Sequence, residues 1–180
     1  MIKRRRFVSL IAALIMLNGC DSVSTEDDPS SVADLCQNIF DLCISPILQG
    51  PIGPGVVSGL GPVSCAASAC HTASGSGGGF VLIQSPGSAS DLAFNFNSAQ
   101  AFVNAANVSQ SRLLAEPLVG DGGVASIGSH GGGDVFANSS VACYQEIFNW
   151  ASTPNGTCPT NCSVLTGTGP TPADLAACTP

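Results

Sequence analysis

The sequence predicts a small, mainly α-helical domain, in which about three helices are joined by long loops and held by disulfides. Apolar residues recur at helical spacing in three segments, residues 31–48, 98–107 and 140–151. The chain has 21 glycines and 12 prolines, and all of these except Pro46 lie outside the three segments. Nine cysteines in 180 residues add the expectation of covalent cross-links.

The first helix is predicted over residues 31–48. Ser30 or Ser31 can cap its N-terminus, and Asp34 would lie in the first turn, where the helix dipole favours an acid. Pro46 is expected to end the helix. The apolar face consists of Leu35, Ile39, Leu42 and Cys43.

The second helix is predicted over residues 98–107 with Ser98 as its cap, and the third over residues 140–151 with Ser139 or Ser140 as its cap. Between the first two helices, residues 80–83 are expected to form a short strand. Residues 91–96 are expected to form a turn followed by apolar anchors. The predicted buried positions of the two helices are Ala101, Phe102, Ala105, Tyr144, Ile147, Phe148 and Ala151.

The N-terminus has the pattern of an export signal. Residues 3–6 are all basic and residues 7–17 are apolar, a run of eleven that is too short to span a bilayer. The next residues, Leu17-Asn18-Gly19-Cys20, resemble the lipobox of bacterial lipoproteins, which implies cleavage after residue 19 and acylation of Cys20. An uncleaved membrane anchor is the alternative. Residues 20–30 are then a lipidated acidic tether, anchored to a membrane without crossing it.

Removal of residues 1–19 makes the chain strongly acidic. One arginine remains against twelve acids, a net charge of −11. This charge excludes nucleic-acid binding and suits a basic protein partner.

The cysteine count fits an oxidising compartment, periplasmic or at the cell surface. Beyond Cys20, eight cysteines remain. They can close four disulfides, or three if Cys65 and Cys70 have another role. Residues 154–180 show no helical periodicity and are expected to be a tail pinned by disulfides. The candidates for three disulfides are Cys36, Cys43, Cys143, Cys158, Cys162 and Cys178.

The segment Cys65-Ala66-Ala67-Ser68-Ala69-Cys70-His71 carries the clearest chemical signal. Two thiols followed by an imidazole are the groups that attach a haem covalently, because the thiols add to its vinyl groups and the histidine ligates iron. The usual spacing has two residues between the cysteines, and here there are four. A plain disulfide turn between Cys65 and Cys70 is the alternative.

The two histidines of the chain are His71 and His130, and both methionines lie in the export signal. A haem held by His71 would therefore take His130 as its sixth ligand. Arg112, the one basic residue of the mature chain, is expected either to pair with a nearby acid or to contact a haem propionate. The glycine-rich residues 72–79 either pass close to a flat ring or form a flexible surface loop.

In order, these features resemble small c-type cytochrome domains of exported bacterial proteins, including the planctomycete-type cytochrome c-like domains. The resemblance spans residues 36–151. Within this span, the matching segments after Cys65–His71 are Ser111-Arg112-Leu113-Leu114-Ala115-Glu116-Pro117-Leu118, His130-Gly131-Gly132-Gly133 and Tyr144-Gln145-Glu146-Ile147-Phe148-Asn149-Trp150. It implies one covalent haem c bound through Cys65 and Cys70, with His71 as the proximal ligand.

The leading hypothesis is a lipid-anchored monohaem cytochrome of one domain, residues 31–153, that carries electrons to or from a redox protein on the outer or periplasmic face of a membrane. Phe80, Phe102, Phe136, Phe148 and Trp150 are expected to wall the haem. No histidine is left to act as a catalytic base, so an enzyme is not expected. The alternatives are a haem-free, disulfide-rich binding or structural lipoprotein, and a zinc or copper site made of Cys65, Cys70, His71 and His130.

Overall fold

The computed structural model describes residues 34–51, 64–75, 77–120, 130, 135–153, 156–165, 169–176 and 178. Within these ranges the chain forms helices and no strands, apart from one isolated bridge between Leu118 and Phe136. The expected small, mainly α-helical fold is therefore confirmed. The predicted export signal, the lipobox and the tether lie outside the described residues.

The first helical segment runs without a break through α1 (Gln37–Ile39), the π-helix η2 (Phe40–Ile44) and α2 (Ser45–Gln49). The prediction that Pro46 ends the helix is wrong. Pro46 lies in the first turn of α2, where a missing N–H costs little, and the wide π-turn before it shifts the hydrogen-bond register. Asp34 precedes the helix by three residues, so it is not in the first turn as predicted.

The second helix begins nine residues before its predicted start and ends seven residues before its predicted end. Helix α3 spans Ala89–Gln100, where a turn was expected over residues 91–96. Ser88 caps it, and Asp91 completes a capping box by accepting the backbone N–H of Ser88. The predicted cap, Ser98, is instead in the last turn of α3. Residues 101–107 form turns that lead to the 3₁₀ helix η3 (Val108–Gln110) and to α4 (Arg112–Ala115).

The third predicted helix is confirmed as α5 (Ala142–Ser152), although its N-cap is Val141 without a side-chain bond. Serines 139 and 140 are therefore not its cap. Trp150 is buried and its indole N–H donates to the carbonyl of Cys36 at 3.1 Å, which joins α5 to the start of α1. A further short helix, α6 (Pro172–Ala176), was not expected from the sequence.

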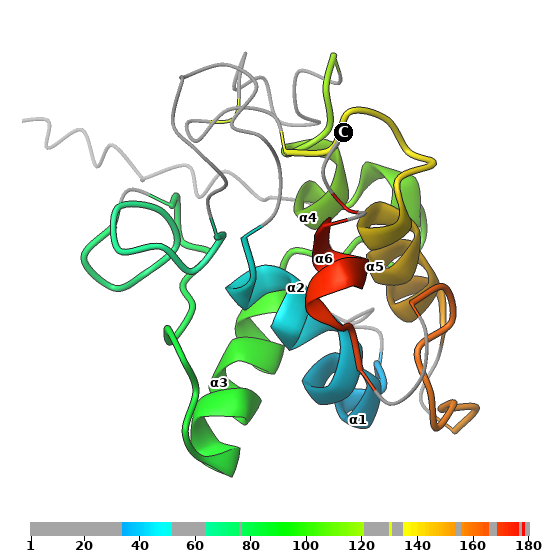
Figure 1. Cartoon of the computed structure of the whole chain (residues 1–180), viewed down its shortest axis with the longest axis horizontal. Helices are drawn as coiled ribbons and strands as arrows, with labels where there is room; N and C mark the ends of the chain where they lie inside the picture. The colour runs from blue at the N-terminus through cyan, green and yellow to red at the C-terminus, as the bar shows by residue number, and fades with distance from the viewer. Residues whose placement is uncertain are drawn as a thin grey trace, which may run out of the picture.

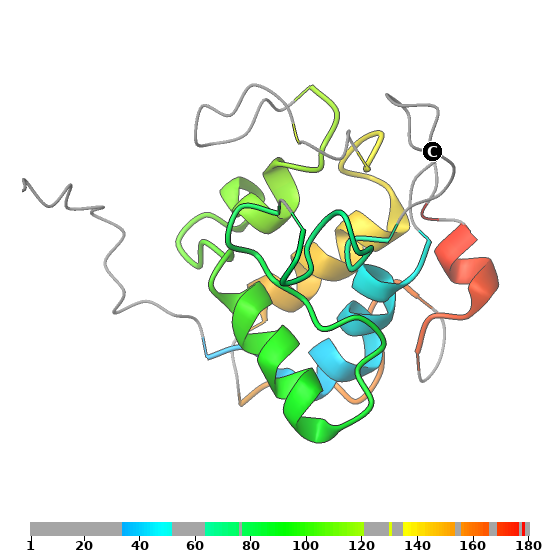
Figure 2. The same cartoon turned by 90° about the vertical axis from the view of Figure 1, so that its left-hand side faces the viewer.

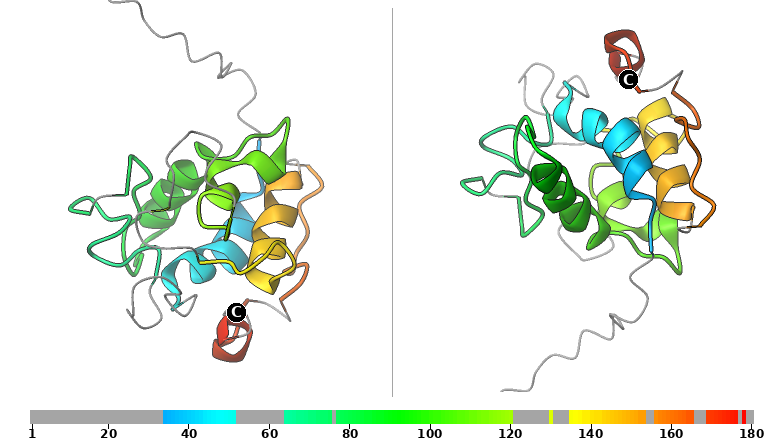
Figure 3. Two further views of the ribbon diagram at one scale, coloured as in Figure 1. Left: turned by 90° about the horizontal axis from the view of Figure 1, so that it is seen from above. Right: turned by 90° about the horizontal axis from the view of Figure 1, so that it is seen from below.

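The segment α1–η2–α2 lies between α3 and α5 in the views along the vertical axis (Figure 3). Its Phe40 is fully buried and contacts Phe96 of α3 and Trp150 of α5, with ring centres 5.6 and 5.4 Å away. These three aromatic residues form the centre of the core. Helix α6 lies at the edge of the molecule, beyond these helices (Figures 2 and 3).

The described residues between α2 and α3, 64–75 and 77–88, form a layer of loops on one side of the helices (Figures 1 and 2). Residues 80–83 of this layer form no strand, contrary to the prediction. Helix α3 supplies the hydrogen bonds that a neighbouring strand would give. The Asn95 side chain bonds both backbone groups of Ile83, at 2.7 and 3.0 Å, and the Ser98 hydroxyl accepts the N–H of Val81.

Three disulfides tie the C-terminal tail to the helices, as expected from the six candidate cysteines. They join Cys36 to Cys158, Cys43 to Cys162 and Cys143 to Cys178. Stable disulfides form outside the reducing cytosol, so the protein is one of an oxidising compartment. Among the described residues, no helix is long and apolar enough to cross a membrane.

Candidate functional site

The Cys65–His71 segment is a compact series of turns fixed to the end of α2. The N–H of His71 donates to the carbonyl of Cys65 at 3.0 Å, which closes the segment into a loop. Ala66 is fully buried and its N–H donates to the carbonyl of Leu48 at 3.1 Å. The four-residue spacer is thus accommodated by local turns, with both cysteines at the ends of one closed loop.

Cys65 and Cys70 are free thiols, whereas the other six described cysteines are all in disulfides. The disulfide turn that was the alternative for this pair is therefore not formed. Burial, and then the neighbouring Cys70 thiol, raises the pKa of Cys65 to about 12. A thiol with so high a pKa remains protonated at neutral pH and is a poor nucleophile on its own.

The backbone of the loop that follows sets the orientation of His71. Its Nδ1 lies 3.1 Å from the carbonyl oxygen of Gly77 and 3.0 Å from that of Phe80. Both partners are acceptors, so Nδ1 carries the proton and Nε2 keeps its lone pair. This is the arrangement in which a histidine ligates a metal through Nε2.

Burial lowers the pKa of His71, and the nearby His130 lowers it further, while the carbonyls of Phe80 and Gly77 and the charge of Glu116 oppose this shift. The net effect favours the neutral imidazole at neutral pH. A neutral imidazole is the form that binds a metal ion.

Two of the glycines of residues 72–79, Gly75 and Gly77, are required by close packing. A Cβ atom on Gly75 would lie 2.0 Å from the carbonyl oxygen of Cys70, and one on Gly77 would lie 2.3 Å from Nδ1 of His71. Both distances are far below contact distance. At Gly77 the backbone passes close to the imidazole of His71, while the passage of this loop beside a haem stays a prediction.

His71 and His130 line one cavity. Their ring centres are 5.8 Å apart and their ring planes differ by 16°. The cavity is partly open to solvent and its enclosed volume is about 30 Å³, which is smaller than the usual volume of a small-molecule site. The other lining residues are Leu48, Cys65, Phe80, Phe102, Arg112, Leu113, Glu116, Pro117, Val135, Phe136 and Ile147.

The aromatic wall is partly the one predicted. Phe80 contacts the His71 ring, with ring centres 4.7 Å apart, and Phe102 lies behind Phe80 at 5.2 Å. Phe136 also lines the cavity. Phe148 and Trp150 do not: Trp150 packs on Phe40 in the core, and the Phe148 ring stacks on Tyr144, with ring centres 6.5 Å apart.

Arg112 stands at the cavity in an ion pair. Its Nε lies 2.6 Å from Oε1 of Glu116, one helical turn along the chain, and its guanidinium carbon lies 5.0 Å from the centre of the Phe102 ring. The expected pairing with a nearby acid is confirmed. Sequence reasoning missed Glu116 as a site residue, although its spacing of four residues from Arg112 is a signal for such a pair.

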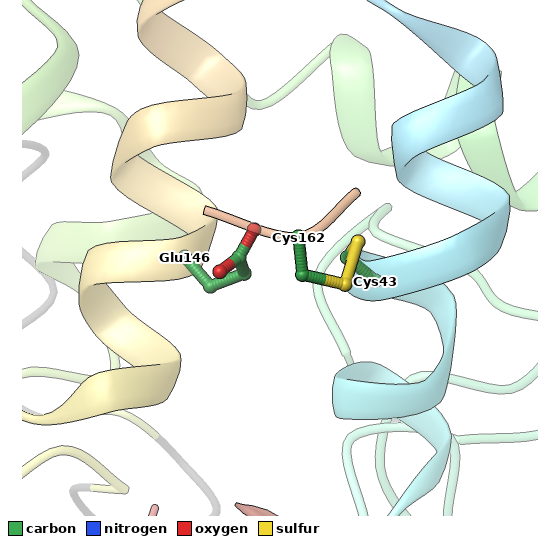
Figure 4. Close-up of side chains that lie close together, drawn as sticks. All are labelled: Cys43, Glu146 and Cys162. Atoms are coloured by element: carbon green, nitrogen blue, oxygen red, sulfur yellow. A yellow bond between two sulfur atoms is a disulfide. The ribbon is translucent and has the colours of Figure 1, made fainter. Parts of the chain in front are cut away.

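A second cluster of potential ligands is structural. Among the described residues, Cys43, Glu146 and Cys162 are the one group of three whose ligand atoms lie within 4.8 Å of one another (Figure 4). The two cysteines share a disulfide. The buried carboxylate of Glu146 accepts hydrogen bonds from the backbone of residues 163–165 and from the Ser163 hydroxyl. Its role is to hold the tail against α5.

Comparison with protein-family models, curated proteins and solved structures finds no match to this chain. The fold and the site therefore define a class by their own features: a small helical domain of an oxidising compartment, with three disulfides, a two-histidine cavity lined by the free thiol of Cys65, and a second free thiol, Cys70, that does not line it.

Proposed function

We propose that the protein is an exported monohaem c-type cytochrome that transfers electrons. One observation carries the proposal: His130, which lies far along the chain from Cys65 and His71, lines the same cavity as both, and the centres of the two imidazole rings lie 5.8 Å apart in it. The sequence motif alone could not require His130 to approach His71.

The closeness of the two rings supports a shared metal ion. Their centres lie 5.8 Å apart and a metal–imidazole bond is about 2.0–2.1 Å long, so His71 and His130 would be the residues that hold such an ion. The apolar lining, including Phe80, Phe102 and Phe136, suits the body of a porphyrin.

The arrangement of the thiols argues against a closed zinc or copper site. In a tetrahedral site, both sulfurs and both imidazoles would converge on one ion. The described residues contain one such convergence of three ligands, and it includes none of Cys65, Cys70, His71 and His130. Covalent haem attachment would not require this convergence, because the thiols would bond to the edge of the ring and only the histidines would ligate the iron.

The chain's own groups account for the attachment chemistry. Each cysteine S–H adds across a vinyl double bond, so that a carbon–sulfur bond forms and the hydrogen goes to the other vinyl carbon, with no net oxidation. When bound, haem supplies an iron that accepts one electron from a reduced protein donor and passes it to an oxidised protein acceptor. Two histidine ligands leave no open position for a substrate, which favours electron transfer over catalysis.

The proposed location is a membrane surface, to which an acylated Cys20 would anchor the domain. Four described acids act within the fold: Asp91 and Asp174 cap helices, Glu116 pairs with Arg112 and Glu146 holds the tail. Of the other eight acids, five precede residue 35. A basic redox partner would therefore meet the negative charge of this protein mainly in the segment before residue 35, which includes the tether.

The test is the intact mass and the pyridine haemochrome spectrum of the protein exported together with a cytochrome c maturation system. We expect the mass of one haem that resists acid extraction, and a low-spin spectrum without a methionine–iron band. His130→Ala should make the spectrum high-spin, and Cys65→Ala with Cys70→Ala should abolish covalent attachment. A colourless protein with two free thiols would refute the proposal in favour of a haem-free, disulfide-rich binding module.

A further inference from the structure

A groove separate from the two-histidine cavity lies where the loop layer meets α3 (Figure 2). It has a volume of about 520 Å³ and is open to solvent, whereas the enclosed volume of the histidine cavity is about 30 Å³. Ligand pockets in proteins usually have volumes of about 300–1,000 Å³. The groove is therefore large enough for a small ligand, and it shares no lining residue with the histidine cavity.

The lining of the groove is neutral and of mixed polarity. Its polar members are Ser68, Thr72, Ser74 and Gln84, and its other members are Ala73, Val81, Leu82, Ile83 and Phe94. The whole chain has a net charge of −7, and the groove has no basic side chain that would attract an anionic ligand. An acyl chain would cover the hydroxyls and the amide without giving them hydrogen bonds, which costs free energy. The lining therefore suits a neutral ligand that has both apolar faces and hydroxyl groups.

The floor of the groove, residues 81–84, is fixed by side chains of α2 and α3. The N–H of Ile83 donates to the Asn95 side chain at 2.7 Å, and the Ile83 carbonyl accepts from the amides of Asn95 and Gln49, both at 3.0 Å. Gln49 also accepts the N–H of Ser85 at 3.0 Å. Because the floor is already ordered, binding a ligand costs little conformational freedom there.

The backbone next to Gln84 is held in an uncommon conformation. Ser85 has a φ of 52°, in the left-handed region that residues other than glycine seldom adopt. The Gln49 side chain holds this turn by bonding the residue on each side of Gln84. The Gln84 side chain is exposed and makes no hydrogen bond to another described residue. Its amide is thus kept at the groove with two donors and one acceptor for a ligand.

Phe94 supplies an aromatic face to the groove. Its side chain is 46% exposed, whereas Phe96 of the same helix is 8% exposed and packs in the core. A pyranose ring has C–H groups on its faces and hydroxyls at its edge. The C–H groups pack against the electron-rich face of an aromatic ring, and the hydroxyls need polar partners. In the loop wall, the Thr72 hydroxyl donates to the carbonyl of Ser68 at 2.8 Å, which leaves its oxygen able to accept from a ligand.

We propose that this groove binds a neutral oligosaccharide, with the Phe94 ring stacked on a sugar ring and with Gln84 and Thr72 bonded to its hydroxyls. The inference does not rest on the proposed function, since the groove and the histidine cavity share no lining residue. It adds a glycan-binding activity to the domain. A domain in an oxidising compartment would attach to a surrounding glycan by this groove.

The experiment measures the binding of chitotetraose, cellotetraose and maltotetraose to the full exported chain, by saturation-transfer difference NMR and isothermal titration calorimetry. At least one of them should bind with a millimolar or lower Kd. Phe94→Tyr should keep this binding, whereas Phe94→Leu, which stays apolar but loses the aromatic ring, should weaken it about tenfold. Gln84→Ala should weaken it about fivefold. Val119→Ala is the control, because it shortens a 43% exposed apolar side chain outside the groove, and it should bind like the parent.

Two outcomes overturn the inference: no binding of any of the three oligosaccharides, or equal binding by the parent and Phe94→Leu. The second outcome would mean that an apolar contact, and not a sugar–aromatic stack, holds the ligand. Urea denaturation midpoints close to that of the parent show that a loss of binding is not a loss of folding. Haem content is measured in the same samples. A haem-free protein that binds sugar refutes the proposed function alone, and a haem-loaded protein that binds none refutes this inference alone.

Discussion

Replacing Gly77 by alanine tests how the site holds His71. The new Cβ would lie 2.3 Å from Nδ1 of His71 and 2.9 Å from its Cα and Cγ, so the loop or the imidazole must move by about 1 Å to reach normal contact distances. A hydrogen bond of 3.1 Å between Nδ1 and the Gly77 carbonyl does not survive such a shift. Overpacking costs about 1–3 kcal/mol and a lost hydrogen bond about 1 kcal/mol. We therefore expect Gly77→Ala to lower the free energy of unfolding by about 2–3 kcal/mol.

Urea denaturation with the disulfides intact measures that change. Gly87→Ala is the matched control, because a Cβ there meets no atom within 4 Å, and it should alter stability by less than about 0.5 kcal/mol. Nitrogen NMR of the His71 ring adds a readout specific to the site, since loss of the carbonyl acceptors should mix the two neutral tautomers. Equal stability of the two variants, together with a single Nδ1–H tautomer in Gly77→Ala, would refute the proposed role of this loop.

Further predictions concern the helix caps, the buried acid and the disulfides. Ser88→Ala should cost about 1 kcal/mol of stability in urea denaturation. The capping hydrogen bonds lower the pKa of Asp91. The contribution of the ionised Asp91 side chain to stability is therefore present above its unfolded pKa and is lost as the pH falls through its folded pKa. Asp91→Asn should flatten this part of a stability-versus-pH curve. Glu146→Gln places an amide NH₂ against backbone N–H donors and should cost about 2–4 kcal/mol, with faster proteolysis of the tail. Replacing Cys36 and Cys158 by alanine removes a disulfide that spans 122 residues. In the same denaturation assay the free energy of unfolding should fall by about 4 kcal/mol, and a fall of less than about 1 kcal/mol would contradict this account.

The fold could be predicted from the sequence where apolar periodicity was strong. Helix α5 shows this, because Tyr144 and Ile147 are buried at helical spacing. Helix α3 was missed because its buried face includes Asn95, a polar residue whose amide pairs with the backbone of Ile83 rather than with solvent. The Ser88–Asp91 capping box is the local sequence signal that marks the start of α3.

The site was more predictable than the helices, because few residues could form it. With two histidines in the chain, any two-histidine cavity must contain His71 and His130. Glu116 and Gly77 could not be assigned to the site in this way. The place of Glu116 at the cavity depends on how α4 faces it, and that of Gly77 depends on the path of a loop around an imidazole.

The long spans of two disulfides have a consequence for the order of covalent events during biosynthesis. Cys36 and Cys43 pair with partners 122 and 119 residues later, so neither native bond can form until nearly the whole chain has been exported. Cys65 and Cys70 emerge well before those partners, and closure of a short loop is entropically easier than closure of a long one. The nascent chain therefore passes through a stage in which the easiest oxidation products are non-native. Reaching the native set requires thiol–disulfide exchange, or early capping of Cys65 and Cys70, before the tail arrives.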